Sequence, residues 1–277
     1  MSIYILMPVF NRLELTKTAL KCIQNQLIDE VLCTIVIDDG STDGTSEYLR
    51  NDPNVTVLQG DGSLWWGGSI ELGIQYVLRE ASTDDWILLL NNDTSFDSDF
   101  IRSLHETALT FKPAAVGSVI CDINQPNNVI SIGPKIDPWR LRICDALGNN
   151  RVRQRDYYHV DALSGRGTLY PISVFKLCGT MRPTLLPHYF ADYELSLRAK
   201  NSGYKLVVSG KARTLSIDEY SNSTYFPLRT RFTSKKSSLF IPAVLTFWFT
   251  ASINFFQTIT LLPRFFLKTL YSILRHS

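Results

Sequence analysis

The sequence contains few cysteines, and no two of them have metal-binding spacing. Five cysteines are scattered along 277 residues without a CxxC pair. A disulfide framework or a structural zinc site would need cysteines that lie closer together in the chain. We therefore exclude a disulfide-stapled domain and a cysteine-ligated zinc site, and we expect reduced, mostly buried thiols.

The N-terminal sequence MSIYILMPVF lacks the features of a secretory signal peptide. It has no basic leading region and no long apolar stretch. Its pattern is that of a first strand. We expect the main body of the chain to be cytoplasmic.

Strong net charge is also missing. Lysine and arginine number 28 and aspartate and glutamate 26, so the formal charge of +2 does not indicate a nucleic-acid partner. With 45% hydrophobic residues the chain is not disordered. The total hides an asymmetry, because residues 1–210 carry 19 basic and 24 acidic side chains, whereas residues 211–277 carry 9 and 2. A mildly acidic body precedes a basic, apolar C-terminal segment.

Short apolar runs that alternate with helical patterns dominate the body. The runs at residues 3–7, 32–37, 55–58 and 86–90 predict buried strands, and helices are expected after residue 11 and over residues 69–80. Strands that are apolar throughout indicate a parallel sheet covered on both faces. Residues 122–161 break the alternation and predict an irregular insertion or hairpin. A helix over 192–201 and a strand over 205–208 follow.

Three polar clusters come directly after predicted strands. They are Pro8-Val9-Phe10-Asn11, Asp38-Asp39-Gly40-Ser41 and Asn91-Asn92-Asp93. Each alone is typical of an ordinary turn or helix cap. In open α/β sheets, however, ligands bind beyond the carboxyl ends of the strands, so three such clusters in order indicate a ligand site.

Longer motifs around these clusters carry a family resemblance. They are PVFNR (8–12), IDDGSTDGT (37–45), GDGSLWWGGSIELGI (60–74), LLLNNDT (88–94), SGRGTLYP (164–171) and PHYFADYELSLRAKNSGYKL (187–206). Over about residues 3–210 the sequence resembles the family 2 inverting glycosyltransferases of the GT-A fold. The resemblance implies a Rossmann-like mixed sheet, mostly parallel, with helices on both faces. It is greatest to bacterial enzymes of surface-polysaccharide and lipopolysaccharide synthesis, including rhamnosyltransferase-like members.

The resemblance implies a nucleotide site. Asp38 would accept a hydrogen bond from the N–H of a pyrimidine ring, and Asp39 would assist it. Pro8 and Phe10 would line the base and ribose pocket. The expected nucleotide-binding residues are Pro8, Phe10, Asn11, Asp38, Asp39, Gly62 and Asn92.

Asp93 occupies the acidic position of the family's DxD-type metal motif. The motif here reads Asn91-Asn92-Asp93 and has one carboxylate instead of two. Oxygen ligands suit Mg²⁺ or Mn²⁺, which would offset the charge of the departing nucleotide. We expect a divalent cation with further ligands from water and the nucleotide.

Asp192 is the expected catalytic base. The family's usual Glu-Asp pair is Ala191-Asp192 in this sequence, and a carboxylate there could take the proton of an acceptor hydroxyl. The alternative is a plain helix N-cap. Glu194 and Arg198 lie four residues apart and could form a structural ion pair.

Further residues are candidates for substrate contacts. Aromatic rings pack well on sugars, glycine allows close approach, and arginine offers a donor fork for phosphate. Core packing is an equal alternative for the two tryptophans. The candidates are Trp65, Trp66, Gly67, Arg166, Gly167, His188 and Tyr189. His105 falls on an expected surface helix and has no assigned role.

The C-terminal segment contains a long uncharged run. Residues 237–263 hold 27 positions without charge, with Lys235 and Lys236 before them and Arg264 and Lys268 after them. We expect residues 211–277 to form a helical membrane-association segment after a transferase domain at 1–210. The helices would lie peripherally on the inner face of the cell membrane. A single span, packing on the catalytic body and a homodimer contact are the alternatives.

The function we expect is sugar transfer. An inverting enzyme would move a sugar from a UDP- or dTDP-linked donor to a hydroxyl of a saccharide or a lipid-linked acceptor. One alternative is a sugar-1-phosphate nucleotidyltransferase, although PVFNRLELTK lacks the glycines of its phosphate loop. The other is a catalytically silent, nucleotide-binding membrane scaffold, against which the retained Asp192 argues.

Overall fold

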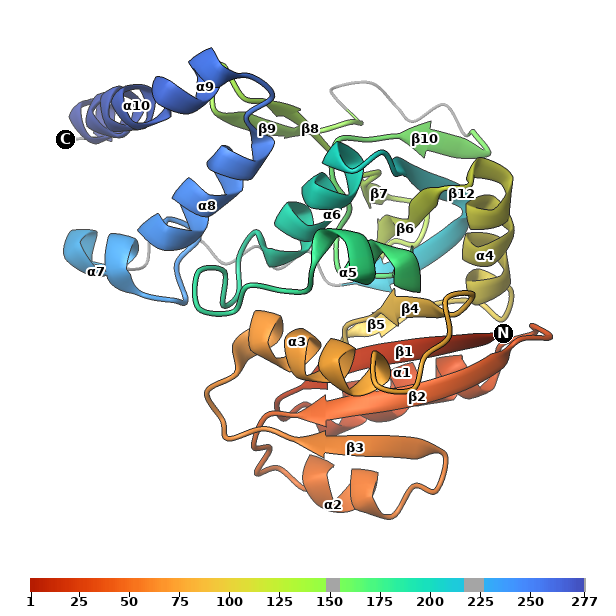
Figure 1. Ribbon diagram of the computed structural model, residues 1–277. Helices are drawn as coiled ribbons and strands as arrows, with labels where there is room; N and C mark the ends of the chain where they lie inside the picture. Colours follow the sequence, from red (N-terminus) through yellow and green to blue (C-terminus); the bar gives the residue numbers. More distant parts are fainter. Residues whose placement is uncertain (148–154, 217–226, 277) are drawn as a thin grey trace.

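The computed structural model describes residues 1–147, 155–216 and 227–276 (Figure 1). Within these residues, one ten-stranded sheet has the main strand order β10-β12-β6-β11-β4-β1-β2-β3. These strands are β1 (Ser2–Val9), β2 (Val31–Asp38), β3 (Val55–Gln59), β4 (Trp86–Leu89), β6 (Ala114–Asp122), β10 (Tyr157–His159), β11 (Thr168–Pro171) and β12 (Lys205–Ser216). The short β5 (Thr94–Ser95) pairs with β12, and β7 (Val129–Ser131) pairs with β6.

The sheet is mixed and mostly parallel, which confirms the expected fold class. β1 pairs in parallel with β2 and β4, as β2 does with β3 and β6 with β12. β11 lies antiparallel between β4 and β6. Successive residues of β1 face opposite cores, with Leu6 in one and Ile5 and Met7 in the other, which is why the strand is apolar throughout.

Helices bury an apolar stripe on each face of this sheet. The helices α3 (Trp65–Val77), α5 (Ile172–Cys178) and α6 (Ala191–Asn201) contribute to one core. The helices α1 (Leu13–Gln24), α2 (Thr45–Arg50) and α4 (Phe100–Phe111) contribute to the other. Figure 1 shows α3, α5 and α6 together on one side of the strands.

Two local features differ from the sequence-based predictions. The helix predicted over 69–80 runs from Trp65 to Val77, and the last strand continues to Ser216 with a register shift between Ser209 and Arg213. The hairpin predicted as one possibility within residues 122–161 is present as β8 (Pro134–Asp137) and β9 (Arg142–Asp145), and the described residues there also form β7 and β10.

His105 lies on the expected surface helix, α4, but on the face that is turned toward the sheet. The side chain is buried, with its ring edge-on to Trp86 and Nδ1 3.1 Å from a Glu30 oxygen. The apolar contact with the sheet explains the burial, because Trp86 begins β4 under α4.

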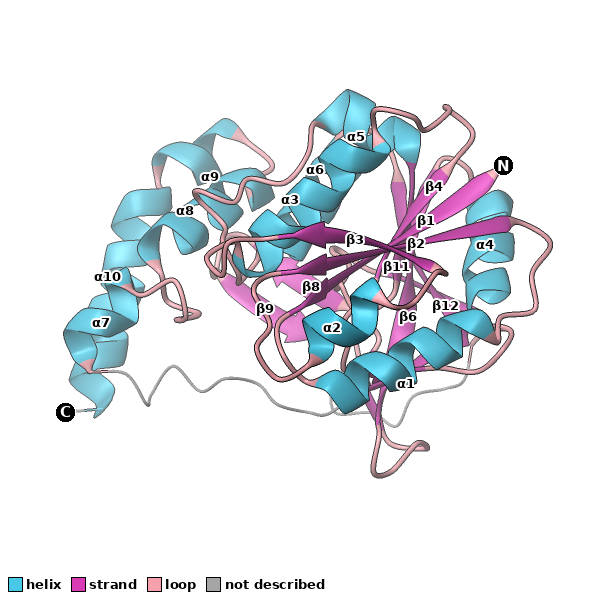
Figure 2. Cartoon of the chain, turned by 90° about the horizontal axis from the view of Figure 1, so that it is seen from below, coloured by secondary structure: helices cyan, strands magenta, loops and turns pink. Residues whose placement is uncertain are grey.

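The C-terminal segment packs on the sheet-containing body through α8 (Ile241–Ala251). Phe247 is fully buried and stacks on Phe190 at a ring-centroid distance of 4.9 Å. Its helix neighbours Val244 and Trp248 are buried in the same cluster. Figure 2 shows the C-terminal helices gathered beside α6 and the β8–β9 hairpin.

The uncharged run is not one helix. It is divided among α8, α9 (Phe255–Ile259) and the start of α10 (Leu261–His276), and α7 (Leu228–Thr233) precedes it. Arg264 donates hydrogen bonds to the carbonyls of Pro138 and Trp139, so it fastens α10 to the β8–β9 hairpin. In the part of the chain that the structure describes, no helix is long and apolar enough to cross a membrane.

Candidate active site

The three polar clusters meet at one edge of the sheet. Val9 at the end of β1 lies opposite Asp38 at the end of β2, and Leu6 of β1 lies opposite Leu89 at the end of β4, two residues before Asn91. Pro8 is part of β1, whereas Phe10 follows the strand with its side chain exposed. The edge is therefore the one at which ligands of open α/β sheets bind.

Asn11 and Asn92 hold these loops together. The Asn11 side-chain oxygen accepts a hydrogen bond from Thr42 N at 2.8 Å, and Asn11 N donates to Ser41 Oγ at 2.8 Å. Asn92 Nδ2 donates to Thr16 Oγ1 in α1 at 3.0 Å. The structure thus gives both asparagines a loop-fixing role, and their predicted nucleotide contacts stay predictions.

Asp38 is fully buried beneath its own turn. Its carboxylate accepts hydrogen bonds from Ser41 N at 2.9 Å and from the Ser46 hydroxyl. Both oxygens therefore already stabilise the turn. A carboxylate has further lone pairs for a ligand, so the predicted contact with a base remains a prediction.

Asp39 organises the glycine-rich loop and the start of α3. Its Oδ1 accepts from Gly62 N at 2.9 Å, and its Oδ2 accepts from Trp65 N at 3.1 Å. Gly62 has a φ of 85°, a backbone conformation that favours glycine. These contacts explain why the helix begins at Trp65, ahead of the predicted start.

Asp93 is paired with a residue that the sequence patterns did not single out. Arg12 Nη1 lies 3.1 Å from Asp93 Oδ2. The other carboxylate oxygen, Oδ1, is buried and has no hydrogen-bond partner among the described residues. An unpaired oxygen of this kind fits a divalent cation, since hard cations prefer carboxylate ligands.

Protein ligands for such a cation are few. No group of three or more histidine, cysteine, aspartate or glutamate side chains gathers at a metal-binding distance within residues 1–147, 155–216 and 227–276. Asp93 would hold a cation together with water and nucleotide oxygens. This agrees with the single carboxylate of the Asn91-Asn92-Asp93 sequence.

Trp66 connects the Asn91 loop to the segment around Gly165. Its indole N–H donates to Asn91 Oδ1 at 2.9 Å. A Cβ atom at Gly165 would lie 2.2 Å from Trp66 Cζ2, so only glycine permits this contact. Trp66 therefore bridges two parts of the site, in addition to packing in the core.

Asp192 accepts hydrogen bonds from two backbone groups. Its Oδ2 accepts from Gly165 N and its Oδ1 from Tyr193 N, both at 2.8 Å. Burial raises the pKa of the Asp192 carboxyl, while these two N–H groups and the charge of Arg166 offset part of the rise. A carboxyl with a raised pKa is a stronger proton acceptor once it is ionised, as a general base requires.

The alternative helix-cap role of Asp192 does not match the helix start. α6 begins at Ala191, and its N-cap is Phe190, which has a left-handed φ of 66° and no side-chain cap bond. Asp192 is therefore inside the first turn. Its carboxylate joins α6 to the Gly165 loop.

Trp65, His188 and Tyr189 form an aromatic group beside the start of α3. The rings of Trp65 and His188 are 6.2 Å apart, and those of His188 and Tyr189 are 4.7 Å apart. Lys236 of the C-terminal segment lies 5.5 Å from the centre of the Trp65 ring. Gly67 brings the two segments close, because its N–H donates to Pro187 O at 2.8 Å.

Arg166 and Gly167 form a tight turn in the segment that follows Gly165. The Arg166 carbonyl accepts from Ser118 Oγ at 2.9 Å. Gly167 has a φ of 95°, and a Cβ atom there would lie 2.8 Å from Phe100 and Ser118. The glycine is thus required by the turn, and its predicted substrate contact is not tested by this geometry.

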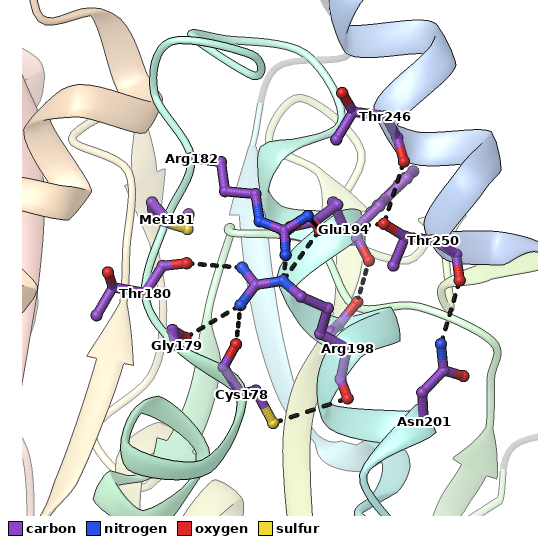
Figure 3. Close-up of polar contacts among 12 residues, drawn as sticks. Cys178, Gly179, Thr180, Met181, Arg182, Glu194, Arg198, Asn201, Thr246 and Thr250 are labelled. Carbon is purple, nitrogen blue, oxygen red and sulfur yellow. Dashed lines mark hydrogen bonds and ion pairs between the residues drawn. The ribbon is translucent and has the colours of Figure 1, made fainter.

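A charged network fixes the helix that carries Asp192 (Figure 3). Glu194 is only 1% exposed and pairs with Arg198 at 2.9 Å and with Arg182 at 3.0 Å. This confirms the expected pair of Glu194 and Arg198. Thr250 Oγ1 of α8 donates to the same carboxylate at 3.1 Å.

Arg198 extends the network to the backbone. Its guanidinium donates to the carbonyls of Cys178, Gly179 and Thr180, as Figure 3 shows. The network therefore ties α6 to the loop after α5 and to the C-terminal segment.

Sequence reasoning did not single out Arg12, and it placed Asn91 and Gly165 in the site without predicting their contacts. Each lies within a quoted motif, respectively PVFNR, LLLNNDT and SGRGTLYP. Only the structure shows what these residues contact, because their partners lie 25 or more positions away in the chain.

The fold is that of the GT-A glycosyltransferases. Residues 4–174 match the family described as "Glycosyl transferase family 2". Because this match spans more than half of the sequence, the chain belongs to the family 2 glycosyltransferases.

Solved structures share the fold at low sequence identity. "Crystal structure of GalNAc-T7 with UDP, GalNAc and Mn2+" is 13% identical with a TM-score of 0.64, and the match covers 79% of this chain and 44% of that one. "Crystal structure of S. aureus TarS 1-349" is 17% identical with a TM-score of 0.56, and the match covers 78% and 60%. This chain therefore spans less than two thirds of either protein.

Curated relatives come from mycobacteria. "Uncharacterized protein Rv1525" of Mycobacterium tuberculosis (strain ATCC 25618 / H37Rv) is 24% identical over 227 residues, which is 81% of this chain and 77% of that protein. "Uncharacterized protein Mb1552" of Mycobacterium bovis (strain ATCC BAA-935 / AF2122/97) matches with the same identity and coverage.

Removal of the Glu194 carboxylate should destabilise the protein strongly. Glu194→Ala removes the carboxylate from the buried pair with Arg198, and loss of one partner of a buried ion pair typically costs about 3–5 kcal/mol of unfolding free energy. Urea denaturation followed by circular dichroism measures the loss. Glu14→Ala removes an exposed carboxylate paired with Lys17 and should cost about 0.5 kcal/mol. Equal effects of the two variants would contradict a stabilising role for the network.

Proposed function

We propose that the protein is an inverting, metal-dependent glycosyltransferase. It moves a sugar from a UDP- or dTDP-linked donor to a hydroxyl of a saccharide or lipid-linked acceptor, in bacterial surface-polysaccharide synthesis. The observation that carries the proposal is the Asp192 carboxylate, whose raised pKa and backbone hydrogen bonds suit a general base. Family membership favours this function over a sugar-1-phosphate nucleotidyltransferase.

The proposed reaction is a single displacement. Asp192 takes the proton of the acceptor hydroxyl as its oxygen attacks the anomeric carbon, and the bond from that carbon to the nucleoside diphosphate breaks. The configuration of the anomeric carbon is inverted because the acceptor attacks opposite the leaving group. A divalent cation at Asp93 would offset charge on the departing diphosphate.

The expected substrate residues surround this chemistry. Trp65 and His188 are proposed to contact the sugar, with Trp66 placing the loop of Asn91. Arg166 supplies positive charge near Asp192. GalNAc-T7, which shares the fold, was crystallised with UDP, GalNAc and Mn²⁺, and this supports a UDP-sugar and a divalent cation as first choices for assay.

Asp192→Asn should abolish transfer and leave donor binding intact. An amide cannot accept the acceptor proton, so kcat should fall by roughly 10²–10⁴-fold, while the donor Kd stays within about threefold. Release of nucleoside diphosphate measures turnover, and calorimetry measures donor binding. The control is Asp84→Asn, which removes the same charge from an exposed aspartate before the start of β4, at the end of that strand away from the site.

The pH profile gives a second readout of the same residue. Because burial raises the pKa of Asp192, the acid limb of kcat/KM should lie above about pH 4, the value for an ordinary aspartate. Activity is lost as pH falls through the raised pKa, since only the ionised carboxylate accepts a proton. Near-normal turnover by Asp192→Asn would exclude it as the base, whereas donor binding without any turnover in the wild type would favour the silent-scaffold alternative.

Donor binding should depend on a divalent cation at Asp93. A thermal-shift screen of UDP-, dTDP- and GDP-sugars with Mn²⁺ identifies the donor, because a bound ligand stabilises the folded state. EDTA should remove most of that stabilisation, and Mn²⁺ or Mg²⁺ should restore it in the wild type but not in Asp93→Asn. Equal stabilisation with and without EDTA would contradict the metal site.

We also propose that the C-terminal helices rest on the inner face of the cell membrane. Seven large apolar side chains between residues 253 and 267 are more than half exposed, although Leu261 in the same stretch is buried. They are Ile253, Phe255, Phe256, Ile259, Leu262, Phe266 and Leu267. Exposed Lys235 and Lys236 and the basic composition of residues 211–277 suit anionic lipid. Arg264 contributes less to lipid contact than its position suggests, because carbonyl groups of the protein bind it.

The paired substitution Phe255→Ser and Phe256→Ser should weaken vesicle binding. Loss of two exposed phenylalanines should reduce co-sedimentation with phosphatidylglycerol-containing vesicles by about tenfold or more. The matched control is Leu27→Ser with Leu177→Ser, two exposed apolar side chains elsewhere on the surface. Unchanged sedimentation, with a dimer detected by light scattering, would favour the homodimer alternative.

A further inference from the structure

Arg12 occupies an unusual backbone position. Asn11 and Arg12 are consecutive non-glycine residues with left-handed φ values of 58° and 68°. L-residues rarely adopt this conformation, and it persists where surrounding contacts enforce it. In this turn the enforcing contacts are the bonds of Asn11 to Ser41 and Thr42, and the bond from Thr16 N to the Arg12 carbonyl.

This turn places the guanidinium of Arg12 on Asp93, 81 positions further along the chain. Arg12 Nη1 is 3.1 Å from Asp93 Oδ2. The Arg12 side chain is 51% exposed and that of Asp93 is 24% exposed. An arginine that is half in solvent can leave its partner without unpacking the core.

The pair creates a conflict over one carboxylate. A cation at Asp93 would meet the positive charge of Arg12 at close range, and the Asn91-Asn92-Asp93 sequence supplies no second carboxylate to offset it. The conflict disappears if the guanidinium moves to an anion that arrives with the metal. A nucleoside diphosphate is such an anion, and arginine matches phosphate oxygens with its planar fork of donors.

We propose that Arg12 is the counter-ion of Asp93 in the donor-free protein and binds the donor's diphosphate when a divalent cation reaches Asp93. The proposal rests on the proposed function, which assigns the cation to Asp93. To that function it adds Arg12 as a residue that binds the diphosphate, and it predicts how the cation and the nucleotide bind relative to each other. A cation alone is held weakly, because it must compete with the guanidinium, and it enters together with the nucleotide.

The first test measures Mn²⁺ alone, without nucleotide, by the electron paramagnetic resonance signal of free Mn²⁺. Arg12→Ala should bind Mn²⁺ about tenfold more tightly than the wild type, because the competing charge is gone. Arg12→Lys keeps the charge and should stay within about threefold of the wild type. Lys17→Ala removes one positive charge from the adjoining helix α1, where it pairs with Glu14, and should leave Mn²⁺ binding unchanged.

The second test measures nucleotide affinity at saturating Mn²⁺. UDP, dTDP and GDP are titrated by calorimetry, and the diphosphate that binds the wild type should bind Arg12→Ala about tenfold more weakly. General unfolding would weaken both Mn²⁺ binding and nucleotide binding. A variant that binds Mn²⁺ more tightly and the nucleotide more weakly therefore cannot be explained by unfolding.

Failure of this proposal is distinguishable from failure of the proposed function. If Arg12→Ala binds Mn²⁺ no more tightly than the wild type, the counter-ion role is overturned. If nucleotide binding by the wild type nevertheless requires Mn²⁺ and Asp93, the metal site is supported without a counter-ion role for Arg12. If no variant binds Mn²⁺ even with nucleotide, the metal assignment falls as well, and the Asp192→Asn experiment still tests the transferase.

Discussion

The contact between the Trp66 indole and the Gly165 backbone joins the two halves of the site. On one side, the indole N–H holds Asn91 in the loop that carries Asp93. On the other, Gly165 N donates to the carboxylate of Asp192. A side chain at position 165 would occupy the space of the indole, so the distance between the loop of Asp93 and the carboxylate of Asp192 depends on this glycine. Trp66 is a structural bridge whether or not it also contacts a sugar.

Two carboxylates two residues apart in α6 have opposite environments. Asp192 accepts hydrogen bonds from backbone N–H groups, and the charge of Arg166 offsets only part of the rise in its pKa. Glu194 is enclosed by two guanidinium groups and a threonine hydroxyl, so its charge is fully compensated. The first environment suits a group that exchanges a proton, and the second suits a fixed structural charge. The same helix can therefore be rigid at one position and reactive at another.

The sequence alone predicted most of the fold because parallel strands buried on both faces leave continuous apolar runs, as in residues 3–7 and 86–90. Short-range motifs also located the polar edge and the pairing of Glu194 with Arg198. Long-range contacts could not be predicted in this way. The start of α3 at Trp65 depends on Asp39, and the contact of Arg12 with Asp93 depends on a left-handed turn between two non-glycine residues. Neither leaves a periodic signal, which is also why the burial of His105 against Trp86 was missed.

The strand order has a consequence for synthesis on the ribosome. The strands β1, β2, β3 and β4 are neighbours in the sheet and can pair soon after they are made. β11 lies between β4 and β6, so β6 joins the sheet only after β11 has been made, at residue 171. β12 then pairs with β6 through Ser216, and α8 covers Phe190 last. The emerging chain thus exposes the apolar flank of α6 until α8 has been synthesised, and partly folded chains with exposed apolar surface are prone to aggregate.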